Sequence, residues 1–156
     1  MATVKAYVFD AYGTQFDVHS VLDCCEELFP GHGEQLTILW RTKQLEYTWL
    51  RTLMGRYEDF GQITRDALVF ACGRLDLSHS PDQIDLLMHT YRTLRPFPDT
   101  TKALDTLAGT PCAILSNGSP EMLRSAVLSA GFESKFRHVL SVDAVKMYKP
   151  HPATYA

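Results

Sequence analysis

Residues 8–14 read VFDAYGT, and this stretch decides the fold that we expect. It closes a short apolar run, residues 4–9, whose β-forming side chains are typical of a strand buried on both faces. Asp10 and Gly13 end the run, as expected where a strand passes into a turn. A carboxylate at the end of such a strand is a candidate nucleophile, and a solvated turn residue is the ordinary alternative.

The next part of the chain has the apolar spacing of helices. Four such stretches occur, at residues 18–29, 36–54, 63–71 and 84–91. Pro30 and Gly31 end the first, and Gly73 ends the third. The sequence PFP at residues 96–98 then breaks the helical run, because proline lacks an N–H donor and restrains the residue before it.

Strands and helices alternate after this break. The signals are, in order, a helix capped by Asp99 or Thr100, a strand at 112–115, a helix capped by Ser119 with Pro120 in its first turn, and a strand at 138–142. This order predicts an α/β fold with a doubly wound parallel sheet. We expect a Rossmann-like core at residues 1–17 and 97–156, with residues 18–96 inserted as a helical cap after the first strand.

The composition is that of a soluble globular protein of 156 residues, 46% of them hydrophobic and 21% charged. A net charge of −3 gives no reason to expect nucleic acid or an anionic membrane as a partner. No apolar run is long enough to span a membrane, and the start of the chain lacks a signal-peptide pattern. The spacing of Cys24, Cys25, Cys72 and Cys112 fits neither a metal site nor a disulfide framework, which predicts reduced thiols in a cytoplasmic protein.

Polar side chains stand at the carboxyl ends of the three predicted strands. Asp10 ends the first strand, Ser116 and Asn117 follow the second, and Lys149 lies in the loop beyond the third. Open parallel sheets bind ligands at this edge. Taken singly, Asp10 would be a solvated turn residue, Ser116 and Asn117 part of a loop that enters a helix, and Lys149 a surface lysine. Together, in this order, they indicate a site, and no histidine cluster suggests a metal.

Three motifs resemble those of the haloacid dehalogenase superfamily: DAYGT at 10–14, LSNG at 115–118 and YKPHP at 148–152. The segment LWRTKQLEYTWLR at 39–51 is similar to the helical cap of the L-2-haloacid dehalogenases, and the resemblance runs from near residue 4 to the end of the chain. It implies a homodimer that hydrolyses short-chain L-2-haloalkanoic acids to D-2-hydroxyacids through an ester on Asp10. It implies no cofactor and no metal.

Tyr12 separates this activity from that of a small-molecule phosphatase of the same superfamily, which is the alternative enzyme. The resemblance implies that such phosphatases carry a second aspartate two residues after the nucleophile, where it protonates a departing alkoxide. A halide is a weak base and leaves unprotonated, so Tyr12 in this position removes an acid that dehalogenation does not need. The sequence therefore favours cleavage of a carbon–halogen bond.

The core residues have distinct expected roles. Asp10 is the nucleophile, and Lys149 favours its ionised form. Thr14 orients the Asp10 carboxylate by a hydrogen bond, or simply closes the turn. Ser116 and neighbouring backbone N–H groups bind the substrate carboxylate, and Asn117 offers amide donors on the same side.

The resemblance also assigns residues around the substrate. Arg41 gathers the departing halide, although a lone arginine on a helix is usually a surface residue. Tyr12, Leu45 and Phe60 line the alkyl side of the pocket, with plain core packing as their ordinary role. Tyr155 matches a family tyrosine that positions the Lys149–Asp10 pair.

Some features depart from the family pattern. Family members usually have an apolar residue where this chain has Gln15, and they often have a glutamine where it has Thr42. Either change is expected to alter the polarity of the pocket or the range of substrates. Family members continue beyond Ala156 with a further core strand and an acidic motif that acts in ester hydrolysis. Without that strand, residues 4–9 are expected to form an exposed apolar edge. A catalytically incomplete fragment or pseudoenzyme that binds only anions or a partner chain is therefore the alternative of a different class.

Overall fold

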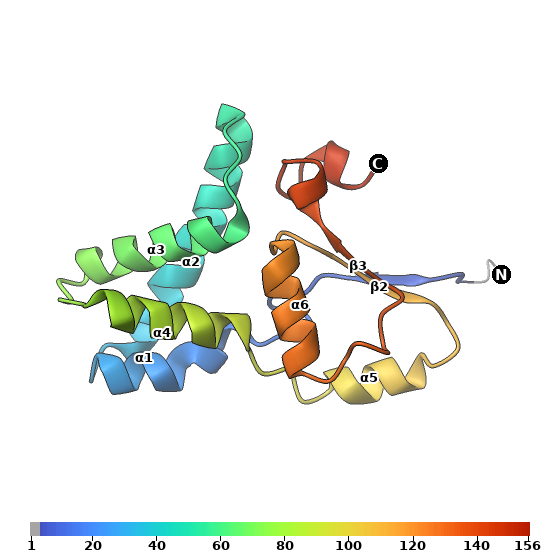
Figure 1. Ribbon diagram of the computed structural model, residues 1–156, viewed down its shortest axis with the longest axis horizontal. Helices are drawn as coiled ribbons and strands as arrows, with labels where there is room; N and C mark the ends of the chain where they lie inside the picture. Colours follow the sequence, from blue (N-terminus) through green and yellow to red (C-terminus); the bar gives the residue numbers. More distant parts are fainter. Residues whose placement is uncertain (1–3) are drawn as a thin grey trace.

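The sheet is three-stranded and parallel in the computed structural model, which describes residues 4–156. Strands β1 (Tyr7–Phe9), β2 (Cys112–Ser116) and β3 (His138–Ser141) lie in the order β1-β2-β3. The pairing register sets Phe9 opposite Ile114 and Ser116 opposite Ser141. The carboxyl ends of the strands therefore meet at one edge, and the predicted parallel α/β sheet is confirmed (Figure 1).

Helices fill the sequence between the strands. In chain order they are η1 (Val18–Val21), α1 (Leu22–Leu28), α2 (Gly33–Met54), α3 (Phe60–Arg74), α4 (Pro81–Arg92), α5 (Thr100–Thr106), α6 (Pro120–Ser129), η2 (Val142–Ala144) and η3 (Pro152–Thr154). We call α1–α4, which gather on one side of the molecule, the cap, and the sheet with α5 and α6 the core (Figure 1). This arrangement supports the division at residues 18–96, which stays a prediction.

Local capping explains where several helices begin. The Ser119 hydroxyl accepts a hydrogen bond from the Met122 N–H at 3.4 Å, and Pro120 occupies the first turn, as the sequence predicts. Asp59 caps α3 in the same way, accepting from the Gly61 N–H at 2.8 Å. The predicted cap of α5 is wrong in its chemistry, because Asp99 holds the N-cap position but its side chain makes no capping hydrogen bond.

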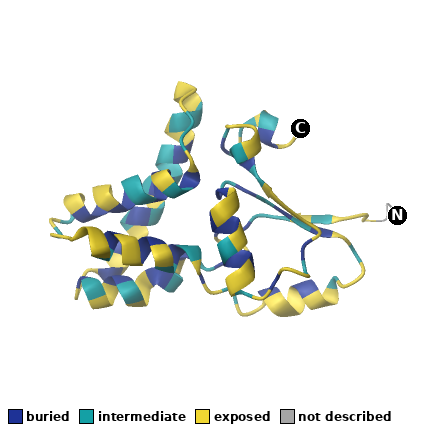
Figure 2. Cartoon of the chain, viewed as in Figure 1, coloured by how far each residue is buried: buried dark blue, intermediate teal, exposed yellow. Residues whose placement is uncertain are grey.

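The cap packs around α2 and α3. Trp40 of α2 is buried, and its indole Nε1 donates to the Thr64 carbonyl of α3 at 2.8 Å, so its polar atom is satisfied inside the core. The buried hydrophobic side chains form one cluster that includes residues of both the cap and the core. Figure 2 marks the buried residues of both parts in dark blue. The junction between the two parts is therefore a packed apolar region.

The strands differ from the sequence-based expectation in length and burial. The predicted strand at 4–9 is shorter, because pairing with β2 begins only at Tyr7. Burial of this strand on both faces is also wrong, since the Val8 side chain is 62% exposed. Within residues 4–156, β1 pairs only with β2, and β3 ends at Ser141 because Val142 begins a 3-10 turn. The first predicted helix is divided between η1 and α1.

Candidate active site

The site is centred on an ion pair at the carboxyl edge of the sheet. Asp10 follows β1 directly, and the Lys149 ammonium lies 2.6 Å from its Oδ1 atom. The same ammonium donates to the Leu115 carbonyl of β2 at 2.9 Å. The two side chains remain 38% and 19% exposed, so the pair is accessible to a small molecule and partly screened by water. The lysine thus holds the carboxylate in a fixed place as an anion-stabilising partner.

The loop after β2 supplies the second part of the site. Ser116 is buried, and its hydroxyl oxygen accepts a hydrogen bond from the Gly118 N–H at 3.1 Å. Asn117 Oδ1 accepts from the backbone N–H of Lys149 at 2.9 Å, which ties this loop to the lysine segment. Among residues 4–156, the Ser116 O–H and the Asn117 amide N–H₂ donate to no partner, so both are suited to bind a ligand carboxylate.

Arg41 reaches from the cap to the loop that carries Asp10. Its Nη2 donates to the Tyr12 carbonyl at 3.1 Å, and its Nη1 donates to Gln44 Oε1 at 2.6 Å. Tyr91 Oη lies 3.4 Å from the same Nη1. The guanidinium is therefore held over the turn two residues beyond Asp10, and it is not the free surface side chain that a lone helical arginine usually is.

Gln44 and Tyr91 support this arginine, although neither residue was predicted from the sequence to belong to the site. Gln44 is fully buried, accepts from Arg41 and Tyr91, and donates to Thr64 Oγ1 at 2.6 Å. A polar residue three positions after Arg41 on an otherwise apolar helical stripe is the signal that could have found it. Burial raises the pKa of Tyr91, so its hydroxyl stays a neutral donor.

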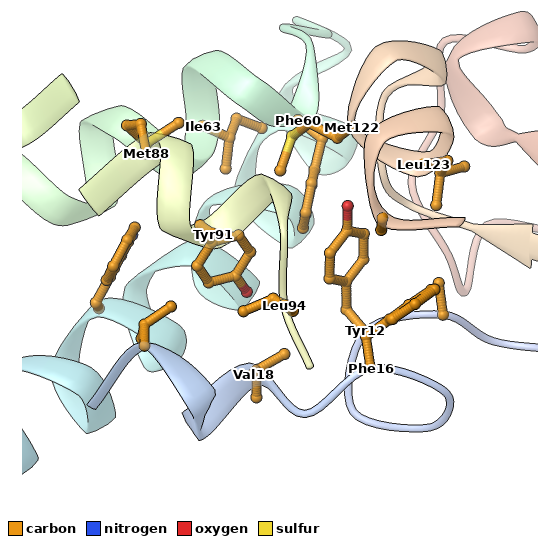
Figure 3. Packing of buried hydrophobic residues seen from close by; sticks show 14 of the residues in the cluster. Tyr12, Phe16, Val18, Phe60, Ile63, Met88, Tyr91, Leu94, Met122 and Leu123 are labelled. Atoms are coloured by element: carbon orange, nitrogen blue, oxygen red, sulfur yellow. The ribbon is translucent and has the colours of Figure 1, made fainter. Parts of the chain in front are cut away.

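Aromatic rings form the wall between the cap and Asp10. The Tyr12 ring centroid lies 5.6 Å from that of Phe60 and 5.9 Å from that of Tyr91 (Figure 3). Burial, and then the neighbouring Tyr91, raises the pKa of Tyr12 far above its ordinary value, so the phenol stays neutral. Leu45 is half-buried on α2, and its place in the substrate pocket stays a prediction.

Two residues predicted for the site do not make the expected contacts. Thr14 is exposed, and among residues 4–156 its hydroxyl forms no hydrogen bond, so the predicted bond to the Asp10 carboxylate is absent. Its backbone N–H instead closes the turn onto Ala11 at 3.2 Å. Tyr155 follows η3 with 61% of its surface exposed, and within the described chain its hydroxyl bonds neither Asp10 nor Lys149.

The two positions that depart from the family pattern lie apart from each other. Gln15 is buried, and its side-chain Oε1 has no hydrogen-bond partner among residues 4–156. Its backbone carbonyl accepts from the Phe97 N–H at 3.0 Å. Thr42 is exposed on α2 and donates to the Ile38 carbonyl of its own helix. Gln15 is thus the departure that changes polarity inside the protein.

The remaining titratable side chains add no further cluster. All four cysteines are free thiols, as predicted. Across the part of the chain that the structure describes, no three histidine, cysteine, aspartate or glutamate side chains gather as a metal-binding group. The same residues include no helix that is both long enough and apolar enough to cross a membrane.

Gly118 should tolerate no side chain, because it lies directly against the Tyr12 ring. A Cβ atom added there would stand 2.6 Å from Tyr12 Cε2 and 3.0 Å from Leu123 Cδ2. We expect Gly118→Ala to lower the free energy of unfolding by about 1–3 kcal/mol and to displace the ring. Gly73→Ala is the matched control, since a Cβ there meets no atom within 4 Å, and we expect it to be neutral or stabilising. Equal urea midpoints for the two variants would contradict this packing.

Comparisons with known proteins agree with the geometry of this site. The family model of haloacid dehalogenase-like hydrolases matches residues 4–156. The chain belongs to this hydrolase family. An (S)-2-haloacid dehalogenase of Xanthobacter autotrophicus is 50% identical over 98% of this chain and 60% of its own length. The haloacetate dehalogenase H-2 of Moraxella sp. (strain B) is 45% identical over 99% of this chain and 70% of its own length.

Solved structures give the same result for the fold. The L-2-haloacid dehalogenase of Xanthobacter autotrophicus with chloropropionic acid covalently bound superposes with a TM-score of 0.93 at 49% identity, over 98% of this chain and 62% of that one. This chain therefore spans about three fifths of the length of the Xanthobacter relatives that it matches.

Proposed function

We propose that this chain carries the nucleophile of a hydrolase that converts short-chain L-2-haloalkanoic acids to D-2-hydroxyacids. The observation that supports it most is the Asp10–Lys149 ion pair at a strand end, with Arg41 held over the same turn by the Tyr12 carbonyl. One anionic nucleophile and two fixed cations are what displacement of a halide from a carboxylate-bearing carbon requires.

In the first step, the Asp10 carboxylate attacks C2 of the substrate. A C–O bond forms as the carbon–halogen bond breaks, the configuration at C2 inverts, and the halide leaves with the bonding electron pair. Arg41 stabilises the departing halide, since guanidinium is permanently charged and donates no proton to it. The donors of Ser116 and Asn117 bind the substrate carboxylate, and Tyr12 and Phe60 pack against its alkyl group.

In the second step, water attacks the carbonyl carbon of the Asp10 ester. The bond between this carbonyl carbon and the substrate oxygen breaks, and one proton of the water passes to that oxygen as the D-2-hydroxyacid leaves. The other proton passes to solvent, and the Asp10 carboxylate is restored with one oxygen atom from water. The covalent adduct of the Xanthobacter relative with chloropropionic acid supports the first of these steps. No metal or cofactor is needed in either step.

The phosphatase alternative is disfavoured by residue 12. A phenol is a much weaker acid than a carboxylic acid, and burial raises the pKa of Tyr12 further, so this side chain is a poor proton donor to an alkoxide. The relatives that support dehalogenation also favour it over phosphoryl transfer.

We further propose a homodimer in the cytoplasm. Trp49, Leu50, Leu53 and Met54 form an exposed apolar face at the end of α2, and such a face is suited to pairing with a second copy. Sedimentation velocity that shows a monomer at all concentrations would contradict the dimer.

The test of function is a comparison of substrates with the purified chain. We expect chloride release from L-2-chloropropionate and none from the D enantiomer. Phosphate release from a monoester with Mg²⁺, without chloride release, would support the phosphatase. Release of neither product, with no modification of Asp10, would support the incomplete fragment or pseudoenzyme.

A further inference from the structure

The segment that carries Lys149 is fastened to the cap by contacts that the proposed reaction does not use. We call this set of contacts the clasp; its cap residues are Thr52, Tyr57 and Glu58, and its core residues are Asp143, Lys146 and Tyr148. The cap residues lie at the end of α2 and in the loop before α3, and the core residues lie in and after η2, just before the lysine.

The first half of the clasp consists of the contacts between the cap and Tyr148, the residue next to Lys149. Its backbone N–H donates to Thr52 Oγ1 at 3.1 Å, and its hydroxyl donates to the Glu58 carbonyl at 2.6 Å. The side chain is fully buried between the two parts of the molecule, and its ring stacks on Tyr57 with centroids 5.0 Å apart. The backbone directly before the lysine is therefore fixed by the cap.

The second half of the clasp holds Tyr57 itself. Its hydroxyl donates to Asp143 Oδ1 at 2.9 Å, and Lys146 Nζ donates to Asp143 Oδ2 at 2.8 Å. The Lys146 ammonium also lies 5.0 Å from the centre of the Tyr57 ring. These bonds join a carboxylate, an ammonium and an aromatic ring into one network, and the hydrogen bond from Lys146 lowers the pKa of the Asp143 carboxyl.

On the core side, and among residues 4–156, the support for the Lys149 backbone comes from the loop after β2. Asn117 Oδ1 accepts from the Lys149 N–H at 2.9 Å. Residue 149 is thus held by the core at its own N–H, while residue 148 is held by the cap. If the cap contacts are lost, the lysine keeps one backbone anchor and its bonds to Asp10 and Leu115, and it can move away from the carboxylate more often.

We infer that Tyr57, Thr52 and Tyr148 are positioning residues through which the cap holds the Lys149 ammonium against Asp10. The cap then has two effects on one carboxylate: it brings Arg41 over the turn, and it fixes the lysine beside it. Displacement of the cap would loosen both at once. This inference rests on the proposed function for the catalytic meaning of Lys149, but the position of the lysine is measurable without turnover.

The test is the reactivity of each lysine toward an amine acylating reagent, read by peptide mass spectrometry. Lys149 Nζ is bonded to Asp10 and Leu115, so it reacts only when it leaves them. The Lys149 side chain is 19% exposed, so the reagent can reach its ammonium once that atom leaves Asp10 and Leu115. Lys102, exposed on α5 and remote from the clasp, is the internal reference.

We expect Tyr57→Phe and Thr52→Val each to raise the labelling rate of Lys149 about 5-fold, the factor given by loss of one ordinary hydrogen bond, with Lys102 unchanged. Tyr57→Phe keeps the stacked ring and removes only the hydroxyl that bonds Asp143. Tyr47→Phe is the matched control, since Tyr47 packs edge-on against Phe70 and its hydroxyl has no partner among residues 4–156.

Equal Lys149 labelling in Tyr57→Phe, Thr52→Val and Tyr47→Phe would overturn the inference. A parallel rise at Lys135, whose ammonium bonds Asp105 in the core, would overturn it as well, because the variants would then loosen the whole fold. In halide release, we expect the two clasp variants to lower kcat with little change in KM, since the carboxylate donors of Ser116 and Asn117 are untouched. If the clasp variants raise the labelling rate of Lys149 but the parent chain releases no halide, the positioning role of the clasp is upheld. That result would contradict only the proposed function.

Discussion

Asp10→Asn is expected to abolish halide release, with a loss of about 10⁴-fold or more in kcat, because a neutral amide is a poor nucleophile toward C2. The substitution keeps the size of the side chain and the carbonyl oxygen that can accept from Lys149, so the fold should persist. Chloride production from L-2-chloropropionate measures the loss, and circular dichroism verifies the fold.

Asp99→Asn is the matched control for this variant. Asp99 undergoes the same chemical change, is exposed, and makes no side-chain capping bond in α5. We expect its rate to equal that of the parent chain. An Asp10→Asn variant that keeps a tenth of the parent rate would show that another group attacks the substrate.

Arg41→Lys is expected to lower kcat by about 10²-fold or more, comparable with removal of one preorganised donor that stabilises transition-state charge. Guanidinium bonds the Tyr12 carbonyl through one nitrogen and Gln44 and Tyr91 through another, and a single ammonium cannot reproduce that fixed geometry. Because halide charge develops mainly in the transition state, kcat and kcat/KM should fall together.

The control for the arginine is Arg51→Lys on the same helix. Arg51 lies near the end of α2, and among residues 4–156 its side chain makes no hydrogen bond, so its rate should be unchanged. A near-normal rate in Arg41→Lys would make Arg41 a structural tie between the cap and the Asp10 turn. The halide would then have to be stabilised by Asn117 or other groups.

The order of helix and strand signals along the chain was enough to predict the parallel sheet and the proximity of Asp10 to Lys149. The alternation of helix and strand signals after residue 98 requires a parallel sheet, and a parallel sheet brings Asp10, Ser116 and Lys149 to one edge. The extent of β1 was not predictable in the same way. Its apolar pattern begins at residue 4, but pairing depends on where β2 begins, and that is set by a contact across more than a hundred residues.

Contacts between side chains were predicted less well than topology. Thr14 received a role from its place in the turn after Asp10 and Tyr155 received one from the family resemblance, but within residues 4–156 neither hydroxyl bonds the ion pair. Gln44 received none, although it is the buried acceptor that orients Arg41. Sequence spacing places such residues on a helix or in a loop, while their partners depend on how separate helices and loops pack against one another; Gln44, for example, bonds Thr64 of α3 and Tyr91 of α4.

A single turnover in ¹⁸O-labelled water shows whether the Asp10 carboxylate forms a covalent bond to the substrate. The chain is used in excess over L-2-chloropropionate, and the peptide of residues 6–41, bounded by Lys5 and Arg41, is sequenced by mass spectrometry. We predict that Asp10 acquires ¹⁸O, or retains the substrate as an ester where hydrolysis is slow. Label in the hydroxyacid, with an unmodified Asp10, would show that water attacks the substrate directly and that Asp10 is not the nucleophile.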